Sequence, residues 1–169
     1  DSCRALGLAV TVVEALDSIL KQTYRPLEII VADDGSTDGT PAVVARYGNQ
    51  VRYNRQEHAG AAVGLNSGLS IPHGDLVAFL DSDDLWHPEK LQRQMARFEV
   101  RPELDLCVTY LQNFWIPDLE DEEARFQNHR LAAALPGYVT QTLLARRAAF
   151  EEVGPFNENL SVGDPADWF

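Results

Sequence analysis

The sequence predicts an α/β fold in which helices sandwich a mostly parallel sheet. Two short apolar runs, LEIIVA at 27–32 and LVAFL at 76–80, alternate with segments of helical periodicity. Such runs are typical of parallel strands that are buried on both faces. An acidic, turn-forming stretch follows each run directly, DDGSTDG in the first case and DSDD in the second. Strand, turn and helix in that order indicate parallel strands joined by crossover helices.

Each element follows from a local pattern. Apolar residues at positions 12, 13, 16, 19 and 20 share one face of a first helix, which ends before Pro26. Thr40 and Pro41 suit the N-cap and first turn of a second helix, and Gly48 can close it. Small residues fill a third helical segment, and Pro88 opens a fourth. We therefore expect helices near 12–20, 40–47, 59–70 and 88–98, and strands at 27–32, 51–56, 76–80 and 104–110.

Length and charge limit the classes of protein that the chain can belong to. A length of 169 residues suits one domain, which we place over 1–169. The formal charge is −12, from 14 Lys and Arg against 26 Asp and Glu. A nucleic acid partner is not expected, because phosphate-backbone binding needs clustered positive charge. No apolar run approaches the ~18 residues of a transmembrane helix, so we expect no transmembrane segment.

The cysteines indicate the cellular setting. Cys3 and Cys107 are far apart and share no metal-ligand spacing, so neither a disulfide framework nor a zinc site is expected. A reducing, cytoplasmic location is the simpler interpretation. Peripheral attachment to the inner membrane face is compatible with it.

Two groups of carboxylates follow the two apolar strands. Asp33 and Asp34 follow the first strand, and Asp81, Asp83 and Asp84 follow the second. Because ligands bind beyond the carboxyl ends of the strands in such sheets, both groups are expected at one crevice. Either group alone could be an ordinary turn or helix cap. Together they would repel an anionic ligand unless a divalent cation mediated, and oxygen ligands without nearby His or Cys favour Mg²⁺ or Mn²⁺ with a nucleotide phosphate.

Three segments carry a resemblance to a known family. They read EALDSILKQTYRPLEIIVADDGSTDGT at 14–40, QEHAGAAVGLNSGL at 56–69 and GDLVAFLDSDDLWHPEKL at 74–91. In the order, the spacing and the residues of these segments, the chain resembles the family 2 glycosyltransferases of GT-A fold. VGPFNENLSVGDPADWF at 153–169 is similar to the segment that leads into the family's acidic ED-type motif. The family's opening strand is not visible in DSCRALGLAV, so we expect a domain truncated at both ends relative to the family.

The resemblance implies transfer of a sugar from a nucleotide-diphosphate donor, with a UDP-sugar expected first, to a hydroxyl of a saccharide or lipid-linked acceptor. Such transfers belong to polysaccharide or cell-envelope biosynthesis. The resemblance implies that Asp34 contacts the nucleotide base, with Asp33 beside it shaping the turn of the same donor site. Asp81-Ser82-Asp83 matches the DxD element, with Asp83 as the expected metal ligand and Asp81 near the ribose or the metal. Asp84 is interpreted as a cap of the following helix.

The resemblance also implies a catalytic base near the end of the chain. Asp164 matches a Gly-Asp form of the terminal motif, and Asp167 is the alternative. A base there would remove the acceptor proton while the hydroxyl displaces the diphosphate in a single step, which inverts the anomeric carbon. One position departs from the family, because Leu65 precedes Asn66 where an Arg is common.

Two other interpretations remain open. The acidic turns also resemble the Mg²⁺ pocket of a receiver domain, a signalling module, but that pocket needs a Lys from a later strand, and the only lysines are Lys21 and Lys90. The other is a transferase-like domain without activity, because the first strand is missing and the terminal motif is altered. His58, His73 and His129 lack ligand spacing and are interpreted as surface or packing residues.

Overall fold

The chain folds as alternating helices and strands. The computed structural model describes residues 8–115, 124–126, 133–159 and 168, with side chains from Val12 onward. Within them the helices are α2 (Leu8–Leu20), α3 (Thr40–Val44), α4 (Ala61–Leu69), α5 (Lys90–Val100) and α7 (Arg147–Val153), with 3₁₀ turns η1 (Ala45–Gln50) and η4 (Thr140–Thr142). The strands are β1 (Ile30–Asp34), β2 (Arg52–Gln56), β3 (Leu76–Ala78), β4 (Leu106–Cys107), β5 (Tyr110–Leu111), β6 (Leu135–Pro136) and β7 (Leu144–Arg146).

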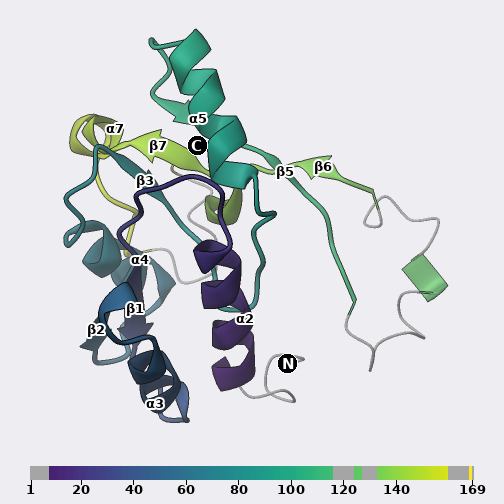
Figure 1. Ribbon diagram of the computed structural model, residues 1–169. Coiled ribbons are helices and arrows are strands. Elements are labelled where there is room, and N and C mark those ends of the chain that lie inside the picture. The colour runs from purple at the N-terminus through teal and green to yellow at the C-terminus, as the bar shows by residue number, and fades with distance from the viewer. Residues whose placement is uncertain (1–7, 116–123, 127–132, 160–167, 169) are drawn as a thin grey trace.

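Strands β1 and β2 form a parallel pair that is covered by helices (Figure 1). Leu16 of α2 packs in one buried cluster with Ile29, the residue before β1. On the other face α4 lies close to β1, because a Cβ on Gly68 would come 3.3 Å from the Cβ of Ala32. The small residues of α4 therefore serve close packing between helix and strand. The register of the pair sets Asp34 opposite Gln56.

Strand β3 is covered on both faces, which explains why LVAFL is apolar throughout. Successive side chains of a strand point to opposite faces. Val77 and Phe79 accordingly join one buried cluster, whereas Ala78 and Leu80 pack against another that includes Trp86. The acidic turn after β3 thus starts from a strand that is fixed between two parts of the core.

The α/β class is confirmed, and one strand departs from the expected parallel arrangement. β1 and β2 run parallel, but β7 lies between β3 and β4 and is antiparallel to both. β7 has three residues and runs directly into α7, so the sequence there shows no strand pattern distinct from a helix. Leu143 and Ala145 are fully buried, and packing in the core decides the conformation of such a short segment.

The acidic turns follow strands of two separate sheets. In the part of the chain that the structure describes, β1 pairs with β2, and β3 pairs with β7. The expected common crevice is therefore not the edge of one continuous sheet, because β3 takes the antiparallel β7 as its neighbour.

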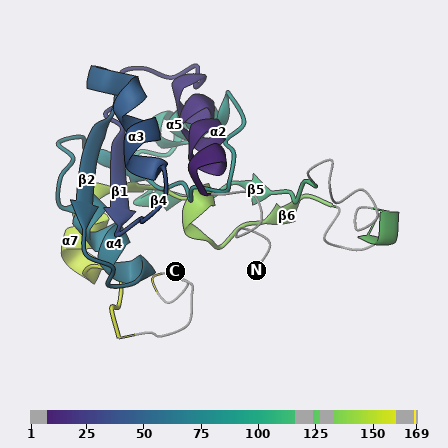
Figure 2. The ribbon, with the colours of Figure 1, turned by 90° about the horizontal axis from the view of Figure 1, so that it is seen from below.

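The expected strand at 104–110 forms two short strands. β4 belongs to the sheet of β7, and β5 pairs with β6 in an antiparallel ribbon of its own. That ribbon extends away from the rest of the fold in two perpendicular views (Figures 1 and 2). The aromatic side chains of Tyr110 and Tyr138 are exposed there. The acidic run at 118–123, expected as a solvated loop, lies outside the described residues.

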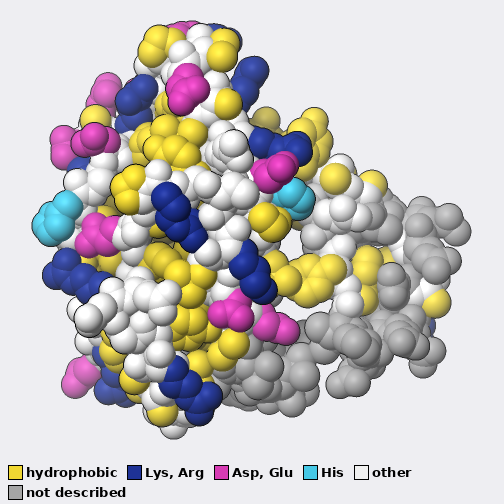
Figure 3. All heavy atoms as spheres, in the orientation of Figure 1, with side chains coloured by type: hydrophobic (Ala, Val, Ile, Leu, Met, Phe, Trp, Pro, Cys, Tyr) yellow, Lys and Arg dark blue, Asp and Glu magenta, His cyan; other side chains and the backbone are white. Residues whose placement is uncertain are grey.

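Charged groups of both signs are spread over the surface. On the face in Figure 3, Lys and Arg side chains are scattered among acidic ones and form no single basic area. This face therefore offers no continuous basic surface to a phosphate backbone. Among the helices of the described residues, none combines the length and apolar character needed to cross a membrane.

Candidate nucleotide and metal site

The first acidic turn ends β1 and is held by donors from the last residue of β2 and from the segment after it. Asp34 Oδ1 accepts hydrogen bonds from Gln56 Nε2 at 2.7 Å and from the Ala59 amide at 2.9 Å. Asp34 Oδ2 accepts from the Gly60 amide and from His58 Nδ1, each at 2.8 Å. A carboxylate has about four acceptor positions, so these donors fill it. Asp34 thereby ties β1 to the start of α4.

The donors also keep the Asp34 carboxylate ionised. Burial raises the pKa of this carboxyl, but hydrogen bonds from Ala59, Gln56, Gly60 and His58 outweigh burial and leave the pKa below its usual value. A nucleotide base that bonds to Asp34 therefore has to replace one of these donors. The side chains of Gln56 and His58 can move aside, whereas the two backbone amides are fixed by the chain.

Asp33 supports the same turn from inside the fold. Its Oδ1 accepts from the Ser36 amide at 2.7 Å, and its Oδ2 accepts from the Tyr53 hydroxyl, with Arg55 Nε 3.9 Å away. Burial raises the pKa of Asp33, and the hydrogen bonds together with Arg55 lower it below its usual value. With 1% of its side chain exposed, Asp33 holds the turn from inside the fold and offers almost no surface.

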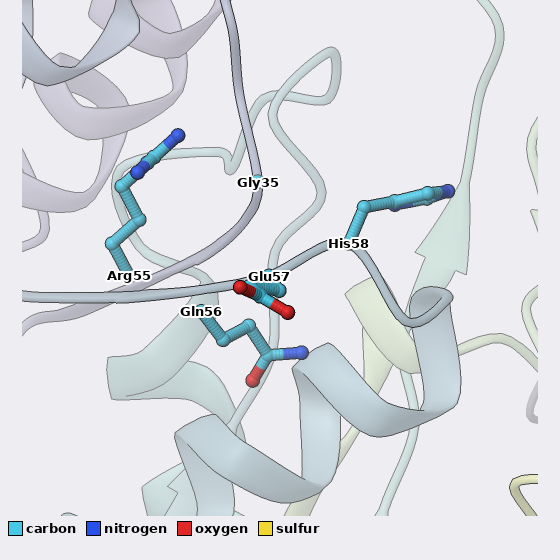
Figure 4. A pocket seen from close by; sticks show the side chains of 5 residues that line it. All are labelled: Gly35, Arg55, Gln56, Glu57 and His58. Carbon is cyan, nitrogen blue, oxygen red and sulfur yellow. The ribbon is translucent and has the colours of Figure 1, made fainter.

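An open pocket of about 420 Å³ lies beside this turn (Figure 4). Gly35, Arg55, Gln56, Glu57 and His58 line it, with Arg55 and His58 on either side of Gly35. Gly35 has a φ of +84°, and a Cβ there would come 2.7 Å from the His58 amide nitrogen. Both the backbone conformation and the available space therefore require glycine. The pocket falls within the usual size of small-molecule sites, about 300–1,000 Å³.

The second acidic turn follows β3 and gathers three carboxylates. Asp81, Asp83 and Asp84 each offer an oxygen, and these oxygens lie within 4.8 Å of one another. Asp83 is exposed, whereas Asp81 and Asp84 are half-buried. Mg²⁺ and Mn²⁺ prefer oxygen ligands, and Mg²⁺ usually takes one or two carboxylates and fills its other positions with water and phosphate. The donor set therefore fits the expected divalent ion.

Burial, and to a smaller extent a neighbouring charge, perturbs the second turn electrostatically. Burial raises the pKa of Asp84, a hydrogen bond from Gln141 lowers it, and the charge of Asp83 raises it, so the pKa lies above its usual value. Gln141, in η4, also donates from Nε2 to Asp81 Oδ2 at 2.6 Å. A divalent ion at this turn would relieve the repulsion among the carboxylates.

The sequence predicted that Asp84 caps the helix after the acidic turn, and this prediction is wrong. The helix begins at Lys90, with Glu89 at the N-cap position and no capping side chain. The loop between the acidic turn and the helix contains the buried Trp86, and its packing in the core moves the helix start away from Asp84.

Polar residues fix that loop from two sides. On the α2 side, Ser18 Oγ accepts from the Trp86 amide at 3.2 Å, and Gln22 Nε2 donates to the His87 carbonyl at 2.8 Å. On the η4 side, Trp86 Nε1 donates to the Gln141 carbonyl at 3.0 Å. The acidic turn is thus followed by a segment with a defined position.

Comparison with known proteins identifies the family. The family described as Glycosyl transferase family 2 matches residues 9–154. The chain belongs to this family. An uncharacterized glycosyltransferase from Rickettsia typhi is 30% identical over 172 residues, which cover 92% of this chain and 52% of that protein. The chain therefore spans about half the length of such family 2 relatives.

Two further matches to this family 2 chain carry functional names. UDP-Glc:alpha-D-GlcNAc-diphosphoundecaprenol beta-1,3-glucosyltransferase WfgD from Escherichia coli is 39% identical over 88 residues, 51% of this chain and 35% of that protein. The mannosyltransferase PcManGT from Pyrobaculum calidifontis, solved with GDP-Man and Mn²⁺, matches with a TM-score of 0.66 and 25% identity, covering 93% of this chain and 46% of that chain. These matches confirm the GT-A fold and remove the receiver-domain interpretation.

A buried lysine of this family 2 domain packs against Trp86, which belongs to the loop after the second acidic turn. Lys90 is 7% exposed, its Nζ donates to Gln94 Oε1 at 2.9 Å, and it lies 4.3 Å from the centre of the Trp86 ring. Burial lowers the pKa of Lys90 to about 7. Lys90 therefore belongs to the support of the loop and not to the pocket that the receiver interpretation required.

In this family 2 domain, α4 also holds the segment that leads to the terminal motif. Asn66 Nδ2 donates to the Phe156 carbonyl at 2.9 Å, and Asn66 Oδ1 accepts from the Phe156 amide at 2.9 Å. Beyond the motif, Trp168 stacks on Phe150 with ring centroids 4.2 Å apart. The described residues on both sides of the terminal motif are thus fixed in the core. Asp164 and Asp167, the two expected bases, lie outside the described residues.

Three residues of the site were not predicted from the sequence. Gln56 is the last residue of a predicted strand and His58 follows it by two positions, at the end where ligands bind, and that position was the available signal. The His58 side chain is exposed, as interpreted, yet it contacts Asp34. Gln141 carried no such signal, because it lies 60 positions from Asp81 in the chain.

Proposed function

We propose that the chain is the catalytic domain of a metal-dependent glycosyltransferase, which transfers a sugar from a nucleoside diphosphate donor to an acceptor hydroxyl. The observation that carries the proposal is the group of three carboxylates after β3, whose oxygens lie within 4.8 Å of one another. Family membership supports glycosyl transfer, and the Mn²⁺ in the complex of the Pyrobaculum mannosyltransferase supports the metal.

The donor base binds at the first acidic turn in this proposal. Asp34 accepts a hydrogen bond from the base in place of Gln56 or His58, and Asp33 keeps the turn in shape. The pocket beside Gly35 is available to the nucleoside. UDP is the first choice because the Escherichia coli relative is named for UDP-Glc, and GDP is the second because the mannosyltransferase was solved with GDP-Man.

The donor diphosphate lies at the second acidic turn, where Asp83 is the main metal ligand and Asp81 lies toward the ribose or the metal. A bound Mg²⁺ or Mn²⁺ stabilises the negative charge that collects on the departing diphosphate. Ser18 and Gln22 hold the following loop, so the carboxylates are oriented before the donor arrives.

The terminal motif supplies the base, with Asp164 first and Asp167 second. The base removes the acceptor proton while the hydroxyl attacks opposite the leaving diphosphate, which inverts the anomeric carbon. We expect Asp164→Asn to lower transfer by ~10²–10⁴-fold and to leave UDP affinity unchanged, because the base acts on the acceptor. Normal turnover in Asp164→Asn together with its loss in Asp167→Asn would place the base three positions later.

The acceptor in this proposal is a saccharide or a lipid-linked sugar. The Escherichia coli relative supports it, since its name gives a diphosphoundecaprenol-linked acceptor. A lipid-linked acceptor would place the reaction in the cytoplasm at the inner membrane face, with the protein attached peripherally.

The deciding experiment is calorimetry of UDP and GDP with and without Mn²⁺, followed by a donor hydrolysis assay. We expect UDP to bind more tightly with Mn²⁺, and UDP at 100 times its Kd to stabilise the fold by ~2.7 kcal/mol in a thermal-shift assay. The proposal fails if Mn²⁺ strengthens the binding of neither diphosphate. Binding without any hydrolysis or transfer would favour the inactive transferase-like domain.

A further inference from the structure

One neutral side chain contacts two of the three carboxylates at the second acidic turn. Gln141 Nε2 donates to Asp81 Oδ2 at 2.6 Å, and Gln141 also hydrogen-bonds to Asp84. It reaches them from η4, on the other side of the loop from α2. Asp83 is the most exposed of the three carboxylates.

The backbone around Gln141 is fixed independently of its side chain. Thr140 and Thr142, its neighbours, are 2% and 3% exposed. Thr142 Oγ1 donates to the Gly137 carbonyl at 2.7 Å, and the Thr142 carbonyl accepts from Gln94 Nε2 at 2.9 Å. The Gln141 carbonyl accepts from Trp86 Nε1 at 3.0 Å. Removing the Gln141 amide group therefore costs η4 one long hydrogen bond, from Thr140 Oγ1 to Gln141 Oε1 at 3.4 Å, and keeps the contacts of Thr142 and of the Gln141 carbonyl.

An amide is suited to this place because it donates hydrogen bonds and carries no charge. A Lys or Arg there would neutralise the turn and compete with a divalent ion for the same carboxylates. The amide instead occupies one oxygen of Asp81 and leaves the negative charge of the group in place. Asp81 and Asp83 each offer an oxygen to an ion at this place, and these oxygens lie within 4.8 Å of one another.

We propose that Gln141 is a positioning residue of the metal site, which holds Asp81 and Asp84 so that the divalent ion binds through Asp83 and one oxygen of Asp81. This inference rests on the proposed metal-dependent function. Residues that hydrogen-bond to metal ligands typically change metal affinity by ~10–100-fold when they are replaced. The Gln141 side chain is expected to have an effect in that range.

The test measures Mn²⁺ alone, by the loss of the free Mn²⁺ signal in electron paramagnetic resonance, and UDP with and without Mn²⁺ by calorimetry. Gln141→Met keeps the length of the side chain and removes the donor. Gln141→Lys keeps a donor and adds a charge. Gln92→Met is the matched control, since Gln92 is an exposed glutamine that accepts from Thr23 Oγ1 at 2.7 Å.

We expect Gln141→Met to weaken Mn²⁺ binding by about tenfold or more, without changing the affinity for UDP in the absence of metal. We expect Gln141→Lys to weaken Mn²⁺ binding further, and Gln92→Met to match the wild type. If the Mn²⁺ affinity of either Gln141 variant is unchanged, this inference is overturned and the proposed function is not. A wild type that binds no Mn²⁺, and neither UDP nor GDP better with it, overturns the proposed function and the inference together.

Discussion

The two acidic turns have similar sequences and both lie at the C-terminal end of a strand, but their carboxylates have opposite surroundings. Asp34 receives four donors, and its pKa lies below the usual value. Asp84 is half-buried beside Asp83, and its pKa lies above the usual value. The protein itself balances the charge of the first turn, whereas the second turn gathers charge that a cation can balance. Acidity in a sequence therefore does not show which carboxylates call for a cation, and the hydrogen-bond donors around each carboxylate do.

Among changes in the two acidic turns, the largest effect that we predict is on stability, from Asp34→Ala. The change removes four hydrogen bonds to one carboxylate and frees the start of α4, so we expect a loss of about 3 kcal/mol in the free energy of unfolding. Urea denaturation measures it. Glu57→Ala is the control, because Glu57 is an exposed carboxylate in the same segment and should unfold like the wild type. A stable Asp34→Ala protein would remove the contrast between the two turns.

Asp83→Ala should act on binding and leave the fold intact. We expect the UDP affinity measured with Mn²⁺ to fall by tenfold or more, corresponding to the ~1.5–3 kcal/mol of an interaction with a charged group. Relief of repulsion should leave the unfolding free energy equal or higher. Calorimetry and urea denaturation on the same samples check both results, with the exposed Asp75→Ala as the matched carboxylate control. If Mn²⁺ strengthened UDP binding by Asp83→Ala as much as by the wild type, the second turn would be an ordinary solvated loop.

Low pH should remove the stabilisation that the first acidic turn gives to the fold. The pKa values of Asp33 and Asp34 are lowered in the folded protein from the usual 3.8. Their stabilisation is therefore complete above about pH 4 and is lost as pH falls toward the lowered values, by about 1.4 kcal/mol for each unit of pKa lowering. Urea denaturation between pH 7 and pH 3 should show a steeper loss for the wild type than for Asp34→Asn. Equal slopes would mean that Asp34 has the same pKa in the folded and unfolded states.

The smallest effect that we predict is a gain in the free energy of unfolding, from Asp84→Asn. The folded pKa of Asp84 is raised, so its ionised form costs stability once the pH rises through that value. Asp84→Asn at pH 7 should therefore stabilise the metal-free protein by about 0.2–1 kcal/mol, the range of charge pairs near the surface. The gain should shrink when Mn²⁺ is added, because the ion already relieves the repulsion. A destabilised Asp84→Asn protein would show that the Asp84 charge is satisfied without metal.

The sequence predicted what short-range patterns determine. The apolar period placed α2, and the apolar runs placed β1 and β3 with the acidic turns directly behind them. The partners of those turns depend on contacts far apart in the chain. Gln56 reaches Asp34 across the β1–β2 pair, and its register with Asp34 could be read only once the pairing was known.

No local sequence pattern could predict that Gln141 contacts the second acidic turn. It lies before a three-residue strand that the core fixes by burying Leu143 and Ala145, and apolar runs of that length do not separate strand from helix. For the same reason the antiparallel β7 was absent from the predicted sheet. Asp84 was misread as a cap because the packing of Trp86, a tertiary contact, sets where α5 begins.

The place of β7 between β3 and β4 has a consequence for how the protein is made. A ribosome adds about 5–20 residues per second, so β3 and β4 emerge seconds before the strand that joins them. Until Leu144–Arg146 has left the ribosome, both strands keep unpaired backbone groups of the kind that template aggregation. A nascent chain that stalls before Leu144 would present the apolar LVAFL run to solvent and be a target for chaperones, and the second acidic turn would gain its glutamine only after the 60 positions from Asp81 to Gln141 had been added.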